Sequence, residues 1–160
     1  MSQKPVESGF HHPLVVRFHE VDSMQVVHHS MYLQWLEACR WAFARDVLDL
    51  TPTGFNELGF ALPVVRAQLD YVEPATLESD ILIVMHYILQ EKVMVSFKYR
   101  VYDRTTGKLI MRARTDHAVM SVETRRLQIQ WPDAWLAKTG RAVEQYPHYF
   151  APDEKKPSRR

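Results

Sequence analysis

The sequence predicts an α+β fold in which one antiparallel sheet curls around a single long helix. The first observation is the order of elements: a short strand, one long helix and then four strands. The second is that the later strands are joined by short connections, which require antiparallel pairing. The third is that the helix is apolar over most of its circumference and must therefore be covered on more than one side. The chain has 160 residues, the length of one domain.

The long helix is predicted by apolar residues spaced three and four positions apart. This stripe consists of Tyr32, Trp35, Leu36, Cys39, Phe43, Val47 and Leu50. Leu33, Trp41 and Leu48 lie off the stripe, and they make the rest of the helix surface apolar as well. Ser30 is a candidate N-cap, and residues 51–54, with their proline and glycine, are expected to end the helix.

Strands are predicted from apolar runs and from alternation of apolar and polar residues. They cover residues 14–18, 61–72, 80–89, 93–101 and 109–122. In residues 93–101 the apolar side chains alternate with Ser96, Lys98 and Arg100, which we expect on the outer face. Residues 131–143 are consistent with a short terminal helix.

The two ends of the chain differ from the rest in composition. We expect residues 1–12 to form a flexible arm, residues 13–143 to form the folded domain, and residues 144–160 to form a solvated tail with a basic end.

Composition excludes several classes of protein. The chain has 20 Lys and Arg against 19 Asp and Glu, a net charge of +1, which gives no reason to expect a nucleic acid as partner. The longest plain aliphatic run, residues 81–85, is far shorter than the roughly 20 residues of a membrane span. One cysteine, Cys39, and a polar start without a signal peptide's apolar stretch predict a cytoplasmic location.

Reactive side chains are concentrated just before the long helix. Residues 19–32 contain two carboxylates, three histidines and three hydroxyl side chains. The N–H groups of a helix start attract negative charge and can stabilise an oxyanion that develops on a carbonyl. A carboxylate such as Asp22 could act as a nucleophile or as a general base toward water, and an imidazole could orient a carbonyl or move a proton. These are the parts of an acyl-transfer site, although Asp22 could also be an ordinary turn residue.

The segment of residues 16–40, VRFHEVDSMQVVHHSMYLQWLEACR, resembles the signature of the hotdog-fold acyl-CoA thioesterases. It is most similar to the 4-hydroxybenzoyl-CoA thioesterase family, which includes the Tol–Pal-associated thioesterases. Residues 71–75 with Asp80 are similar to that family's link between two strands. The resemblance implies a hotdog fold and hydrolysis of acyl-CoA without a metal or other cofactor. It also implies homodimers with sheets paired edge to edge, often assembled into homotetramers, and active sites at the dimer interface; acyl carrier protein stays open as an alternative carrier.

The resemblance places the family's active-site aspartate at Asp22 and its histidine at His29, with a backbone N–H near His29 facing the thioester carbonyl. Two positions depart from the family pattern. Gln25 stands where the family usually has glycine, so this residue must adopt a costlier backbone conformation or shift the loop. Phe18 stands where one branch has a tyrosine, so the hydroxyl that helps to position that site is missing.

We expect substrate contacts from both the loop and the later strands. The expected contact residues are Met24, Gln25, Ser30, Tyr32, Arg66 and Lys92. The two cations among them, with Lys98 and Arg100 as further candidates, would meet the phosphates of CoA. Adjacent side chains in an extended segment point to opposite sides, so at most one of His28 and His29 should face the site. A zinc site built from the histidines and Asp22 is conceivable by residue type, but no helical i, i+4 pair or cysteine supports it.

Cys39 lies on the apolar stripe and is expected to belong to the core. Two other functions stay open at this level. One is an enoyl-thioester hydratase or dehydratase on the same fold. The other is a non-catalytic acyl-CoA-binding protein, which the departures at Gln25 and Phe18 keep open.

Overall fold

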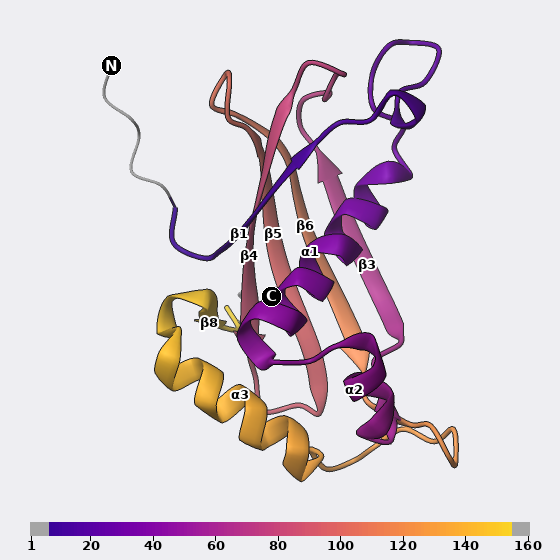
Figure 1. Ribbon diagram of the computed structural model, residues 1–160, viewed down its shortest axis with the longest axis vertical. Coiled ribbons are helices and arrows are strands. Elements are labelled where there is room, and N and C mark those ends of the chain that lie inside the picture. The colour runs from indigo at the N-terminus through magenta and orange to yellow at the C-terminus, as the bar shows by residue number, and fades with distance from the viewer. Residues whose placement is uncertain (1–6, 155–160) are drawn as a thin grey trace, which may run out of the picture.

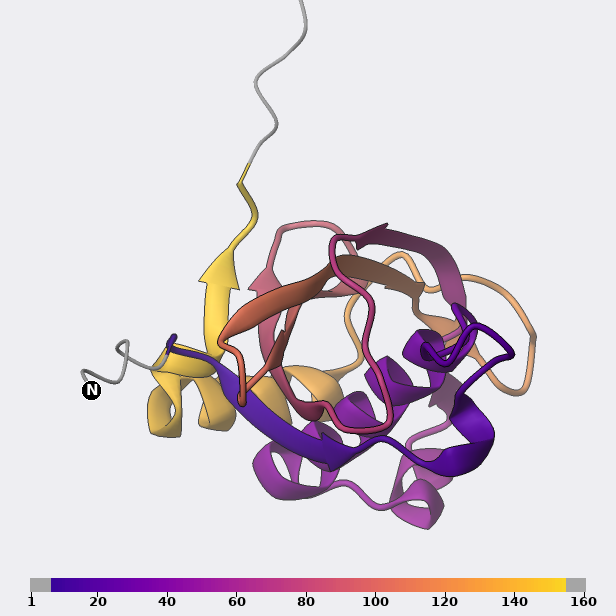
Figure 2. The same cartoon turned by 90° about the horizontal axis from the view of Figure 1, so that it is seen from above.

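One antiparallel sheet curls around helix α1 and encloses the core with it (Figures 1 and 2). The computed structural model describes residues 7–154. The main strands lie in the order β1-β4-β5-β6-β3, and every neighbouring pair in this order is antiparallel. Their bounds are Phe10–Val15 (β1), Val64–Tyr71 (β3), Asp80–Leu89 (β4), Met94–Asp103 (β5) and Lys108–Ala118 (β6). The predicted fold class is confirmed.

Helix α1 spans Met31–Leu48, so it ends before Leu50, the last residue of the predicted stripe. It ends at Asp49, whose φ of 51° is the left-handed conformation of a helix C-cap. Residues 51–54 do not end it. They begin a second helix, α2 (Pro52–Glu57), with the Thr51 side chain as N-cap, because proline is well suited to the first position of a helix.

The core lies between α1 and the inner face of the sheet. The predicted stripe is largely buried, and Phe43 at its centre packs edge-on against Phe10 and Phe97, with ring centroids 5.4 Å and 6.0 Å apart. The remaining surface of α1 differs from the expectation. Leu33 and Trp41 are 44% and 41% exposed, so within one chain the sheet covers only one side of the helix.

Both ends of the chain add to the sheet beyond the predicted limits at residues 13 and 143. β1 begins at Phe10, inside the expected arm, and Phe18 lies after it in a short 3-10 helix, η1 (Phe18–Glu20). The remaining elements are α3 (Asp133–Gln145), η2 (Pro147–Tyr149), β8 (Phe150–Pro152) and a ladder of β2 (Phe60–Ala61) with β7 (Met120–Ser121). β8 pairs in parallel with β4, and the buried Phe10 and Phe150 rings anchor the two ends. The basic end of the expected tail lies outside the described residues.

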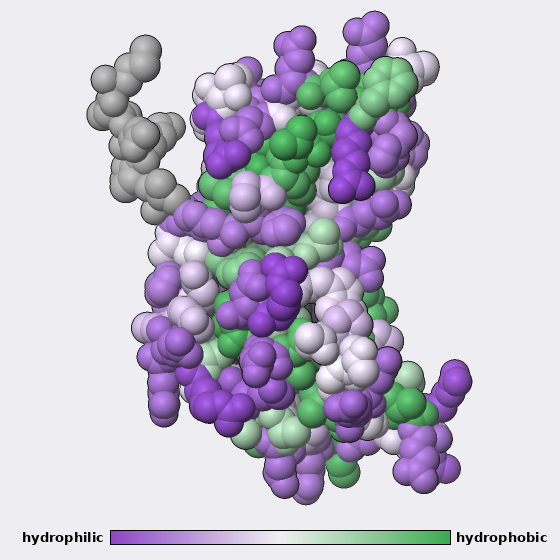
Figure 3. Space-filling model, in the orientation of Figure 1, coloured by the Kyte–Doolittle hydropathy of each residue, from purple (hydrophilic) through white to green (hydrophobic). Residues whose placement is uncertain are grey.

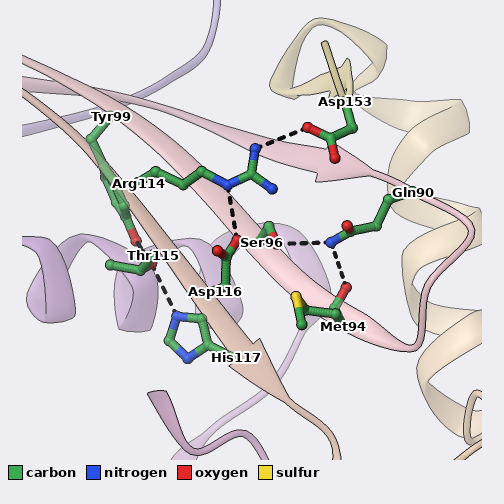
Figure 4. Close-up of polar contacts among 9 residues, drawn as sticks. All are labelled: Gln90, Met94, Ser96, Tyr99, Arg114, Thr115, Asp116, His117 and Asp153. Atoms are coloured by element: carbon green, nitrogen blue, oxygen red, sulfur yellow. Dashed lines mark hydrogen bonds and ion pairs between the residues drawn. The ribbon is translucent and has the colours of Figure 1, made fainter. Parts of the chain in front are cut away.

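A hydrogen-bonded network on β5 and β6 surrounds two buried polar residues (Figure 4). The Ser96 hydroxyl donates to Asp116 Oδ1 at 2.6 Å, and Arg114 Nε donates to the same oxygen at 2.9 Å. Arg114 also donates to Asp153 at 2.9 Å, which ties the segment after β8 to the sheet. Alternation predicted Ser96 on the solvent side, whereas its side chain is fully buried and satisfied by Asp116.

His117 belongs to a second buried chain of hydrogen bonds, which Figure 4 also shows. Its Nδ1 lies 3.2 Å from the carbonyl of Leu62, which can only accept, so Nδ1 carries the proton and Nε2 accepts from the Thr115 hydroxyl at 3.0 Å. Thr115 in turn accepts from the Tyr99 hydroxyl at 3.1 Å. Burial, assisted by the charge of Arg40, lowers the pKa of His117 from 6.5 to about 4.

This lowered pKa predicts a loss of stability in mild acid. Unfolded His117 binds a proton below about pH 6.5 and folded His117 only below about pH 4, so stability should fall as the pH is lowered between these values. Relative to His117→Gln, the wild type should lose about 2–3 kcal/mol of unfolding free energy over this range. Urea denaturation at a series of pH values measures the difference, and parallel pH profiles for the two proteins would contradict it.

Candidate functional site

The loop of residues 16–30 joins β1 to α1 at one end of the sheet (Figure 1). Inside it the chain makes a tight turn, in which the Asp22 N–H donates to the Val26 carbonyl at 2.9 Å and the Gln25 N–H donates to the Asp22 carbonyl at 3.0 Å. Gln25 has a φ of 63°, in the left-handed region that favours glycine. A glutamine here is expected either to adopt a costlier backbone conformation or to shift the loop, and the structure shows the costlier backbone conformation.

Asp22 lies at the surface of this turn with its side chain partly buried. Its Oδ1 accepts the N–H of Met24 at 2.8 Å, which is the geometry of an Asx turn. Among residues 7–154 its Oδ2 has no hydrogen-bond partner. The carboxylate therefore shapes the turn with one oxygen and leaves the other available to water or substrate.

A cleft of about 280 Å³ opens beside this loop, where the start of α1 meets the end of β3. It is lined by Val27, His29, Tyr32, Tyr71, Val72, Glu73 and Pro74. The Tyr71 hydroxyl donates to the His29 carbonyl at 3.0 Å, and the Tyr32 hydroxyl accepts from the Ala75 N–H at 3.3 Å. These two bonds hold the loop and the link after β3 together across the cleft.

Of the two adjacent histidines only His29 lines the cleft, in line with the expectation that at most one faces the site, but the two rings do not point to opposite sides of the chain. The rings of His28 and His29 are 4.2 Å apart, because the backbone turns here and is not extended. Ser30 stands at the N-cap position of α1, but its side chain lies 2.8 Å from His28 Nδ1 and does not cap the helix. The N–H of Met31 donates to the His28 carbonyl at 2.9 Å. The first-turn N–H groups that follow it lack an intrahelical partner, as at any helix start, so they can face an anion beside His29.

Hydrophobic side chains come to the surface at the same end of the molecule, where Figure 3 shows green residues over the end of β1 and the loop. Val15, Phe18 and Met24 are 75%, 84% and 78% exposed. Met24 thus lies on the loop surface and does not line the cleft, so its expected contact with substrate stays a prediction.

The expected cations are not brought to Asp22 within one chain. Lys92 follows β4, whose first residue lies at the loop end of the sheet. A strand of ten residues is about 30 Å long, so Lys92 lies about that far from the loop end. Arg66 is exposed on β3, opposite Asp116. Lys98 and Arg100 line a separate groove of about 570 Å³ formed by the strands and both chain ends. Spacing in the sequence could not reveal which end of a strand each residue would reach.

Other reactive side chains lie elsewhere. Burial raises the pKa of the Cys39 thiol well above its usual range, as expected of a core residue. Tyr71 and Glu73 line the cleft, and sequence reasoning assigned them no role, although their segment carries the second family motif. Among residues 7–154 there is no group of three or more His, Cys, Asp or Glu side chains that could hold a metal ion. None of the described helices is long and apolar enough to cross a membrane.

Comparison with known proteins places the chain in a family. The model of the thioesterase-like superfamily matches residues 16–139, which include the loop, the cleft and most of the sheet. The chain belongs to the thioesterase-like superfamily. A relative from Bacillus subtilis (strain 168), YneP, which is named as a proposed acyl-CoA thioesterase, is 28% identical over 111 residues, 68% of this chain and 78% of that protein. The narrower 4-hydroxybenzoyl-CoA or Tol–Pal branch stays a prediction.

Solved structures of this thioesterase-like fold are similar over most of the chain. The hypothetical protein TT1821 from Thermus thermophilus is 27% identical, with a TM-score of 0.71 over 88% of this chain and 99% of that one. The 1,4-dihydroxy-2-naphthoyl-CoA thioesterase Slr0204 from Synechocystis is 22% identical, with a TM-score of 0.72 over 81% and 93%. SAV2348 from Staphylococcus aureus, solved in complex with CoA, is 14% identical, with a TM-score of 0.76 over 98% and 94%. Because Slr0204 and SAV2348 are less than 25% identical to this chain, their similarity shows the hotdog fold alone.

The left-handed Gln25 predicts an order of stabilities for substitutions at that position. Gln25→Gly should be as stable as wild type or up to about 1 kcal/mol more stable, because relief of strain is partly offset by a freer unfolded chain. Gln25→Val should lose about 1–2 kcal/mol, because a β-branched side chain fits positive φ poorly. Urea denaturation measures both, and a valine variant as stable as the glycine variant would show that the turn has another conformation in solution.

Proposed function

We propose that this chain hydrolyses acyl thioesters, with acyl-CoA as the substrate class. The observation that carries the proposal is a cleft lined by His29 and Tyr32 at the start of α1, in a chain of the thioesterase-like superfamily. Asp22 lies on the loop that leads into this cleft. The names of the relatives that concern CoA thioesters support the same substrate class.

In the proposed reaction Asp22 acts on the thioester carbonyl through its unpartnered oxygen. As general base, it takes a proton from water while the water oxygen attacks the carbonyl carbon. The resulting oxyanion is held by N–H groups of the first turn of α1 near His29, where the helix dipole favours negative charge. Collapse of this intermediate breaks the carbon–sulfur bond, and the protonated carboxyl returns its proton to the leaving thiolate. As nucleophile, Asp22 would form an anhydride that water then cleaves.

The outer edge of β3 supports a homodimer. Within residues 7–154, β6 is the only strand that pairs with β3, and Val64, Val65 and Tyr71 are 51%, 55% and 52% exposed. A free edge strand presents unpaired N–H and C=O groups and is a template for another strand. Tyr71 belongs both to this edge and to the cleft, so a second copy paired here would deepen the site. Further assembly into tetramers and a cytoplasmic location are parts of the same proposal.

Asp22→Asn should lower kcat for thioester hydrolysis by at least about a hundredfold, because an amide can neither accept the proton nor attack the carbonyl, while it can still accept the Met24 N–H. Release of free thiol from short, medium, long and aromatic acyl-CoAs measures the loss. Asp133→Asn, on the distant α3, is the matched control and should change nothing. Turnover of Asp22→Asn within a few-fold of wild type would remove Asp22 from the mechanism.

The same assay separates the alternatives. In a single turnover in ¹⁸O water, an unlabelled first acid product identifies Asp22 as the nucleophile, with water cleaving the anhydride at the Asp22 carbonyl. A labelled acid comes from the general-base route or from water attack at the acyl carbonyl, and trapping the anhydride with hydroxylamine separates these two. A hydratase would add water to an enoyl-CoA without releasing thiol, and a non-catalytic binder would give heat of binding without any product. Acyl carrier protein thioesters, assayed beside the CoA thioesters, identify the carrier.

Val65→Lys should convert the dimer to monomer, because an ammonium on an edge strand opposes strand pairing. Analytical ultracentrifugation measures the mass. Leu136→Lys, on the exposed face of α3, is the control and should stay dimeric. A dimer of unchanged dissociation constant in Val65→Lys would place the interface elsewhere.

A further inference from the structure

Glu20 is a buried carboxylate that the proposed reaction does not use. Its residue is 7% exposed, and both of its oxygens accept N–H groups. Oε1 accepts from the indole Nε1 of Trp35 at 3.0 Å, and Oε2 accepts from the backbone N–H of Arg17 at 2.7 Å. The carbonyl of Glu20 accepts a third bond, from the His28 N–H at 2.8 Å. Among the described residues Glu20 makes no ion pair with a Lys, Arg or His side chain.

These three bonds join three separate parts of the site. Arg17 is where the chain leaves β1 for the loop, His28 is where the loop approaches α1, and Trp35 lies on α1 itself. Asp22 follows Glu20 by two residues and His29 follows His28 directly. The separation between Asp22 and the helix start is therefore set through the Glu20 side chain and backbone.

We propose that Glu20 is a positioning residue. Its carboxylate fixes the loop of residues 16–30 on α1 so that Asp22 and His29 meet the same thioester. This inference rests on the proposed function. A carboxylate is suited to the position because it offers two acceptors and no donor to two converging N–H groups. Glutamine offers one acceptor and one donor, so one of the two N–H groups would face an NH₂ group. The indole of Trp35, which is a donor only, needs such an acceptor when it is buried.

The test combines Glu20→Gln, Trp35→Phe and the double variant. Glu20→Gln should lower kcat about ten- to hundredfold with KM changed less than about threefold, because the reacting groups are displaced while the cleft is kept. In the double variant the amide oxygen can accept from Arg17 while its NH₂ faces the phenyl ring. Its kcat should therefore be severalfold higher than that of Glu20→Gln alone, whereas two unrelated structural defects would add. Glu123→Gln and Trp41→Phe, both exposed, are the matched controls.

Backbone hydrogen exchange supplies a readout that does not depend on turnover. In Glu20→Gln the amides of Val27 and His28 should exchange at least about tenfold faster, while amides in β5 stay as in wild type. If the wild type hydrolyses no thioester, the proposed function fails, and this exchange pattern still decides whether Glu20 holds the loop. Exchange that rises equally across the sheet, or an unchanged kcat in Glu20→Gln, would overturn the positioning role.

Discussion

The packing of one helix against one curled sheet determines the position of every other part of the molecule. α1 is the only long helix that packs on the inner face in the described chain, and the rings around Phe43 lock it there. Because the helix is held along its length, its first turn lies at a defined place near the ends of β1 and β3. The N–H groups of that turn, the loop from β1 and the link after β3 therefore converge at one end of the sheet.

Two carboxylates in this loop, two residues apart, have opposite surroundings. Glu20 points inward and receives N–H groups on both oxygens. Asp22 points outward and receives one, from its own turn. A buried carboxylate needs such donors, because burial without hydrogen bonds strongly disfavours the charged form. The local hydrogen bonds thus distinguish two carboxylates that composition alone could not distinguish. Glu20 maintains the loop, and Asp22 stays accessible for chemistry.

Elements that follow from side-chain periodicity could be predicted, and features that depend on contacts between distant segments could not. The bounds of β4 match the predicted residues 80–89, because a half-buried strand alternates visibly in sequence. The strand at Phe150 escaped prediction, because it depends on the C-terminal segment returning to the sheet. The buried Ser96 escaped it because its partners, Gln90 and Asp116, come from other parts of the chain. The paired rings of His28 and His29 escaped it as well, since the rule of alternation fails where the backbone turns. Charge predicts Arg66 and Lys92 as phosphate contacts, but charge does not say which end of a strand a side chain reaches.

The strain at Gln25 and the open edge of β3 bear on the same site from two sides. A turn with positive φ at a non-glycine residue persists only where its surroundings hold it, and here Val26 and Asp22 close it by backbone hydrogen bonds. The cleft beside this loop, about 280 Å³, is small for an acyl-CoA, since pockets even for drug-sized ligands span about 300–1,000 Å³. Tyr71 lies on both the cleft and the free edge, so any strand that pairs with β3 also changes the walls of the cleft. In the proposed dimer, catalysis and assembly would consequently be coupled through Tyr71, whose hydroxyl donates to the His29 carbonyl.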